Sequence, residues 1–85
     1  MLRISEPMPS RDGVAFRLDG RVIGPWVREL RLVCEAVLAR GEPLTLDLGG
    51  VCFADEAGVA LLRTLAARGA RLDNGSPFVV QRLRA

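Results

Sequence analysis

The chain has 85 residues, of which 49% are hydrophobic and 26% are charged, and its formal net charge is +2. This balance is typical of a folded globular protein, and the length suits one small domain, which we place at residues 1–85. No apolar run approaches the roughly 20 residues of a membrane span, and the N-terminus lacks the layout of a signal peptide. We therefore expect a cytoplasmic protein with no direct membrane insertion.

The basic and aromatic residues argue against nucleic-acid binding. All 12 basic residues are arginines, and they are spread along the chain rather than gathered in one block. Aromatic residues make up only 5% of the chain and include no tyrosine. Because single-stranded nucleic acids are bound largely by stacking bases on aromatic side chains, we do not expect a nucleic-acid partner.

The chain also has few residues that could bind a metal or act as a nucleophile. It has no histidine, and its two cysteines, Cys34 and Cys52, do not form a paired motif. We interpret both as small buried hydrophobic residues in a reducing compartment. A zinc site or a Cys-His nucleophile cannot be assembled from these residues, so we expect no metal, no cofactor and no catalytic residue.

The N-terminal quarter predicts an antiparallel meander of three short strands. Alternating apolar residues and flanking turn residues mark the strands. The expected strands are Leu2–Ile4, Val14–Leu18 and Arg21–Ile23. The expected breaks are Pro7 with Pro9, Asp12-Gly13 and Asp19-Gly20.

Strands and helices alternate in the rest of the chain. Gly24-Pro25 starts a first long helix, in which apolar residues recur every three to four positions, and Gly41 and Pro43 end it. The later elements are a strand at 44–48, a helix at about 56–68, a strand at 70–72 and a short last helix capped by Ser76-Pro77. The alternation predicts an α/β fold.

The stretch 44–62 has the most informative pattern. Leu44, Leu46 and Leu48 alternate with polar residues, as in a strand with one face in a core. A Gly-Gly bend and a second apolar patch follow, and Asp55 is well suited to cap the next helix, because its carboxylate can accept the free N–H groups of the first turn. We expect the loop at 55–58 to be exposed at the end of the sheet.

This stretch resembles the signature of the STAS domain, the fold of bacterial anti-sigma-factor antagonists. The usual form is an apolar strand with an aspartate, a short bend, Asp-Ser-Ser-Gly and an apolar helix. The order of elements extends the resemblance from about Leu2 to Leu83, and it implies a mixed central β-sheet with helices packed mainly on one face. The matching positions are Asp47, Gly50, Val51, Phe53, Asp55, Gly58 and Leu62.

The resemblance implies a non-catalytic regulatory module that binds an anti-sigma factor or a kinase-like regulator. The partner-binding residues would be Asp55, Glu56, Ala57 and Gly58. In the family, a serine just before the motif glycine is phosphorylated by a partner kinase, which switches binding off. Ala57 occupies that position here, so this phosphosite is lost and we expect no switching by serine phosphorylation.

Two other functions stay open. Some STAS proteins of lipid-transport ABC systems have a small alanine before this glycine, so the alternative is an accessory cytoplasmic subunit that docks on a transporter ATPase. A small hydrolase or nucleotide-binding enzyme is disfavoured, because Gly49-Gly50 leads into an apolar patch rather than a helix start. Weak nucleotide binding by some STAS proteins keeps this third possibility open.

Four residues allow more than one interpretation, which is functional as well as structural for Asp55 and Trp26. Asp55 can cap the helix, shape a partner-facing loop, or do both. Gly58 can permit a close backbone approach or be a tolerated weak point in the helix. Asp47 points away from its leucine neighbours and is expected to be buried or half-buried. Trp26 is either partly buried or an anchor for a partner.

Overall fold

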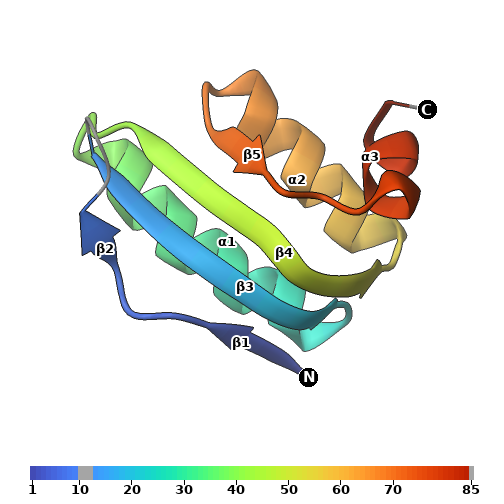
Figure 1. The fold of residues 1–85 in the computed structure, drawn as a ribbon. Coiled ribbons are helices and arrows are strands. Elements are labelled where there is room, and N and C mark those ends of the chain that lie inside the picture. The colour runs from blue at the N-terminus through green and yellow to red at the C-terminus, as the bar shows by residue number, and fades with distance from the viewer. Residues whose placement is uncertain (10–12, 85) are drawn as a thin grey trace.

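A computed structural model describes residues 1–9 and 13–84, which form a five-stranded mixed sheet and three helices (Figure 1). The strand order is β1-β3-β4-β5, with β2 paired to β3. β1 and β2 run antiparallel to β3. β4 pairs with β3 on one side and with β5 on the other, and both pairs are parallel. The elements are β1 (Leu2–Ile4), β2 (Met8–Pro9), β3 (Val14–Val22), α1 (Pro25–Ala39), β4 (Leu44–Ala54), α2 (Glu56–Ala67), β5 (Arg71–Asp73) and α3 (Pro77–Arg84).

The helices α1 and α2 cover one face of the sheet, and α3 lies beside α2 near the end of β4 (Figure 1). Within the described part of the chain, no helix covers the opposite face of β3 and β4 (Figure 1). Each crossover, β3-α1-β4 and β4-α2-β5, joins parallel strands, as expected when a helix separates them. The predicted α/β class, mixed sheet and one-sided helix packing are therefore confirmed.

The predicted N-terminal meander is partly wrong. Residues 14–22 form one continuous strand, so Asp19-Gly20 does not turn the chain. Instead, Gly20 has a φ of +106° and a Cβ there would lie 2.3 Å from the Met1 carbonyl oxygen. The glycine therefore lets β1 approach β3 closely at an irregular point of the ladder.

The prolines near the first strand do not prevent pairing. Met8 and Pro9 form the two-residue strand β2 against β3, although the sequence predicted that Pro7 and Pro9 end strand structure here. An edge position tolerates proline because the missing N–H can face away from the sheet. The predicted Asp12-Gly13 turn lies partly outside the described residues.

β4 is longer than predicted, because the Gly49-Gly50 bend is replaced by irregularities within the strand. Between the pairs Arg17↔Asp47 and Asp19↔Gly50, β3 advances by two residues and β4 by three. A second extra residue follows between Val51 and Phe53. Each extra residue reverses the alternation of faces. The buried positions of β4 are accordingly Leu44, Leu46, Leu48, Val51 and Ala54.

The core lies between the sheet and the helices. The buried faces of the two long helices meet the leucines of β4, and Val79 adds α3 to the same cluster. Burying one such leucine or valine contributes about 1.5–3 kcal/mol, so this cluster dominates the stabilisation of the fold. The helix residues in it are Val27, Leu30, Cys34, Val37, Val59, Leu61, Leu62 and Leu65.

The two cysteines differ in their surroundings. Cys34 is fully buried in the core, as predicted, and burial raises the pKa of its thiol to about 11. Cys52 is exposed, with its sulfur 3.4 Å from the Gly20 carbonyl oxygen, so its predicted burial is wrong. The irregular register of β4 turns Cys52 outward. Within residues 1–9 and 13–84, no helix is long and apolar enough to cross a membrane.

Candidate functional site

The predicted loop lies where β3 and β4 end side by side. The two parallel strands end at Val22 and Ala54, which are register partners, and each leads into a helix. Asp55 follows Ala54, and its backbone N–H donates to the Val22 carbonyl oxygen at 3.2 Å. The starts of α1 and α2 are therefore adjacent, at the carboxyl ends of β3 and β4.

The Asp55 carboxylate joins these two helix starts. Its Oδ1 accepts a hydrogen bond from the Gly58 N–H at 2.7 Å, which is the predicted N-cap of α2. Its Oδ2 accepts from the Gly24 N–H at 3.0 Å, at the residue before α1. The second bond spans 31 residues and was not predicted. No local pattern in the sequence indicates it, because its two residues belong to distant segments.

These contacts also determine the ionisation of Asp55. The hydrogen bond from Gly24 lowers the pKa of the carboxyl group below its ordinary value, and the bond from Gly58 adds to this. The Ala57 N–H and the positive charge of Arg82 act in the same direction against partial desolvation. Asp55 is therefore a carboxylate held by backbone donors, an arrangement that suits a structural joint better than proton transfer.

Gly58 is needed for close packing between α2 and β3. A Cβ at this buried position would lie 2.2 Å from the carbonyl oxygen of Val22. That oxygen belongs to the backbone and already accepts a bond from Asp55, so it cannot move aside easily. Of the two interpretations of Gly58, the structure supports the close backbone approach.

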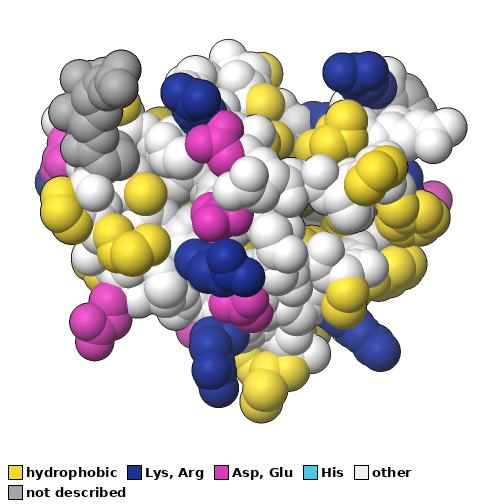
Figure 2. All heavy atoms as spheres, viewed as in Figure 1, with side chains coloured by type: hydrophobic (Ala, Val, Ile, Leu, Met, Phe, Trp, Pro, Cys, Tyr) yellow, Lys and Arg dark blue, Asp and Glu magenta, His cyan; other side chains and the backbone are white. Residues whose placement is uncertain are grey.

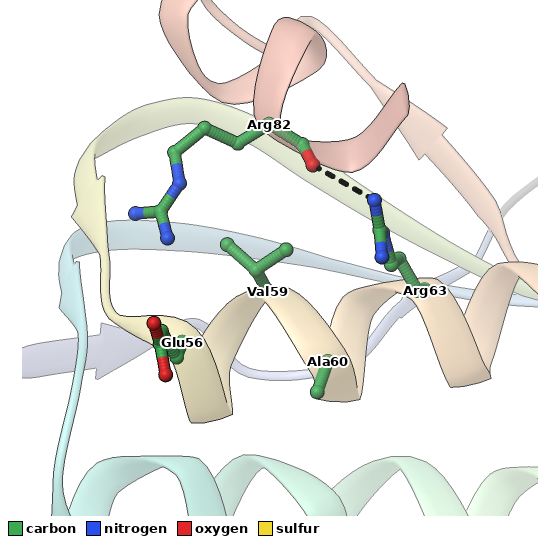
Figure 3. Close-up of a pocket in the computed structure, with 5 residues that line it drawn as sticks. All are labelled: Glu56, Val59, Ala60, Arg63 and Arg82. Atoms are coloured by element: carbon green, nitrogen blue, oxygen red, sulfur yellow. Dashed lines mark hydrogen bonds between the residues drawn. The ribbon is translucent and has the colours of Figure 1, made fainter. Parts of the chain in front are cut away.

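Glu56 and Ala57 form the exposed part of the loop, whereas Asp55 is half-buried and Gly58 is buried. Glu56 also lines a groove between α2 and α3 (Figure 3). Arg63 of α2 donates to the carbonyl oxygens of Leu83 at 3.1 Å and Arg82 at 3.3 Å, near the end of α3. These bonds fix α3 beside the loop, because the last carbonyls of a helix lack partners within it.

Arg82 connects α3 to the same junction. Its Nη1 donates to the Ala54 carbonyl oxygen at 2.5 Å, directly before Asp55. The sequence analysis did not single out Arg63 or Arg82 as part of this site. Their contacts are with backbone carbonyls distant in sequence, and no local pattern indicates such contacts.

The open face of the sheet carries a separate polar cluster around Asp47. Its Oδ1 accepts from the Gly49 N–H at 2.8 Å and from Asn74 at 3.1 Å, and Arg17 lies 3.5 Å from its Oδ2. The Gly49 bond, then Asn74, lower the pKa of this carboxyl group. The side chain is 29% exposed, which confirms the half-buried expectation.

The cluster belongs to a wider band of charge on that face. Figure 2 shows a band of interspersed acidic and basic side chains down the middle of the molecule. Arg17 also pairs with Asp19, and Arg71 pairs with Asp73 on β5. Opposite charges are thus matched on this face, as in an ordinary solvated sheet surface.

Three further residues have structural roles in the described contacts. Trp26 is half-buried and packs against the core, which favours its structural interpretation. The Ser76 hydroxyl accepts from the Val79 N–H at 3.2 Å and caps α3 as predicted. The Thr64 hydroxyl donates to the Ala60 carbonyl oxygen within α2.

Comparison with known proteins supports the fold through structure rather than sequence. No family model and no curated protein matches the chain. Among solved structures, the chain is similar to the anti-sigma factor antagonist SpoIIAA in its unphosphorylated form, with a TM-score of 0.70 and 24% identity. The match covers 99% of this chain and 82% of that one. The predicted resemblance is therefore confirmed at the level of architecture, and the chain has a STAS-like fold.

Proposed function

We propose that this chain is a non-catalytic regulatory module that binds a protein partner through residues 55–58 and the exposed side of α2. The partner is an anti-sigma factor or a related kinase-like regulator, and the setting is cytoplasmic. The observation that carries the proposal is the junction itself. Asp55 holds two helix starts and presents Glu56 and Ala57 to solvent on a rigid support.

Three observations support this proposal. The similar solved structure is that of an anti-sigma factor antagonist. The Asp55 carboxylate is occupied by backbone donors, which suits a support for a binding loop better than an acid or base. Binding surfaces are also commonly loops held by a rigid scaffold.

The loop at 55–58 carries no hydroxyl group, so the proposal includes no switch by serine phosphorylation within the loop. Residues 55–58 are Asp, Glu, Ala and Gly, none of which accepts a phosphoryl group as serine does. The same feature favours the second candidate, an accessory subunit of an ABC-type lipid-transport complex that docks on the ATPase. Ala57 is exposed and small, so a flat protein surface can approach it closely. The two candidates differ in the partner and share the docking surface.

Charge reversal at Glu56 tests the surface. A partner is first isolated by crosslinking and mass spectrometry, and its affinity is then measured by calorimetry. Glu56→Arg should weaken the complex at least tenfold, about 1.4 kcal/mol, because an interface contact then faces a like charge. The fold should lose at most about 1 kcal/mol, since the helix dipole contributes no more.

Glu29→Arg is the matched control. Glu29 is an exposed glutamate of α1 that lines a different depression, beside β1 and the segment before β2. This variant should bind the partner like the parent protein. If it weakens binding while Glu56→Arg does not, the docking surface lies on α1 and the proposal is wrong.

A further inference from the structure

The groove between α2 and α3 has an apolar floor and charged walls. Val59 and Ala60 form the floor, and Glu56, Arg63 and Arg82 stand around it (Figure 3). Its volume is about 360 Å³. A depression of this size has room for one or two side chains of another protein.

Neither arginine of this groove forms a direct ion pair among the described residues, although the charge of Arg82 acts on the Asp55 carboxylate. The ion pairs that the described residues form all lie outside this groove. In the groove on the other side of α2, by contrast, the arginine is paired, because Arg68 contacts Glu35 of α1. Arg82 is partly balanced by the nearby Asp55 carboxylate, so the unpaired positive charge of the α2–α3 groove is that of Arg63.

The two arginines also retain free hydrogen-bond donors. A guanidinium carries five N–H donors in a planar fork. Arg82 donates one described bond, to Ala54, and Arg63 donates two, to the carbonyls of α3. These backbone contacts hold the side chains in place, so the remaining donors are positioned before any ligand arrives. A fixed fork suits a carboxylate, which can accept two parallel bonds.

We propose that the α2–α3 groove receives an acidic segment of the protein partner, with an aliphatic side chain on the Val59–Ala60 floor and a carboxylate against Arg63, about 10 Å along α2 from Glu56. The inference rests on the proposed function, because the groove adjoins the same loop. It adds the chemistry of the partner, which the 55–58 loop alone does not specify.

Two capped peptides provide the test, Ala-Ala-Leu-Glu-Ala-Ala and the same peptide with glutamine in place of glutamate. Each is titrated into the ¹⁵N-labelled chain, and binding is followed by amide chemical shifts. At low ionic strength the glutamate peptide should bind about fivefold more tightly, with shifts concentrated at residues 56–63 and 82. At about 0.5 M salt the difference should shrink, because the Debye length falls to a few ångströms. Equal binding, no binding of either peptide, or shifts elsewhere would overturn the inference.

Substitutions at Ala60 separate charge from shape. Ala60 is exposed and lies three residues before Arg63 on α2, so a glutamate there competes for the guanidinium. Ala60→Glu should abolish the preference for the acidic peptide, whereas Ala60→Gln, which crowds the floor equally, should weaken both peptides alike and keep the preference. Ala67→Glu, about 10 Å further along the helix, should behave like the parent. An acidic preference that survives in Ala60→Glu would also overturn the inference.

The two proposals fail in different ways. If Glu56→Arg leaves the protein complex intact while the acidic peptide still occupies the groove, the proposed docking surface is wrong. If Glu56→Arg weakens the complex but the peptides bind alike, the loop is used and the acidic chemistry of the partner is wrong.

Discussion

Two aspartates of one segment, Asp47 and Asp55, show how differently the same side chain can act. Both accept backbone N–H groups, and in both the pKa is lowered by those bonds. Asp47 bonds within its own strand and to Asn74 and Arg17 on the solvated face. Asp55 bonds to the starts of two helices that cover the other face. The elements that an acid connects, rather than its ionisation, therefore decide its structural importance.

The largest effect should come from the glycine that supports the Asp55 junction. Gly58→Ala places a Cβ against the Val22 carbonyl oxygen and forces α2 away from β3. We expect a loss of roughly 1–3 kcal/mol, the usual cost of overpacking, measured by urea denaturation. At Ala60 of the same helix alanine should be favoured over glycine, and Ala60→Gly should cost about 0.5–1 kcal/mol. A fully stable Gly58→Ala variant would show that the helix start is not closely packed.

Removing each aspartate in turn tests the comparison itself. Asp55→Ala should lower Tm by about 4–8 °C, because two helix starts lose an acceptor. Asp47→Ala should lower it by less than about 4 °C, because exposed ion pairs contribute little. Asp55→Asn should fall between Asp55→Ala and the parent, since the amide keeps one acceptor for Gly58 but offers Gly24 a donor. Differential scanning calorimetry measures all three variants. Equal losses for the two alanine variants would break the distinction between the sites.

The smallest effect should be the dependence of stability on acidity. Both carboxyl groups have folded-state pKa values below the ordinary 3.8, so the unfolded chain binds protons at a higher pH than the folded chain. Their contribution is therefore fully present above about pH 4 to 5 and is lost as the pH falls through the folded values. Urea midpoints between pH 7 and pH 3 should decline less steeply in Asp55→Ala and Asp47→Ala than in the parent. An unchanged slope in either variant would show that its aspartate is not linked to folding.

Local patterns were enough to predict the helices, the first half of β4, the aspartate cap of α2 and the serine cap of α3. Apolar periodicity fixed α1 and α2, and Asp55 and Ser76 were expected as caps from their positions before helices. Such signals depend on residues within one or two turns of each other, which is the range a sequence pattern covers.

The missed features depend on contacts between distant segments. The outward orientation of Cys52 follows from the register of β4 against β3. The need for glycine at position 20 follows from the close approach of the Met1 carbonyl group. The bond between Gly24 and Asp55 and the roles of Arg63 and Arg82 likewise require the tertiary fold. No spacing in the sequence indicates which residues will oppose each other across a sheet with irregular register.

The bond from Gly24 to Asp55 gives the molecule an intrinsic optical signal. Trp26 is the one tryptophan of the chain, it lies two residues after Gly24, and it is half-buried at the start of α1. A displacement of the Asp55 loop is therefore passed through a single hydrogen bond to the helix turn that holds the indole ring. Its emission should register events at the loop without any attached dye.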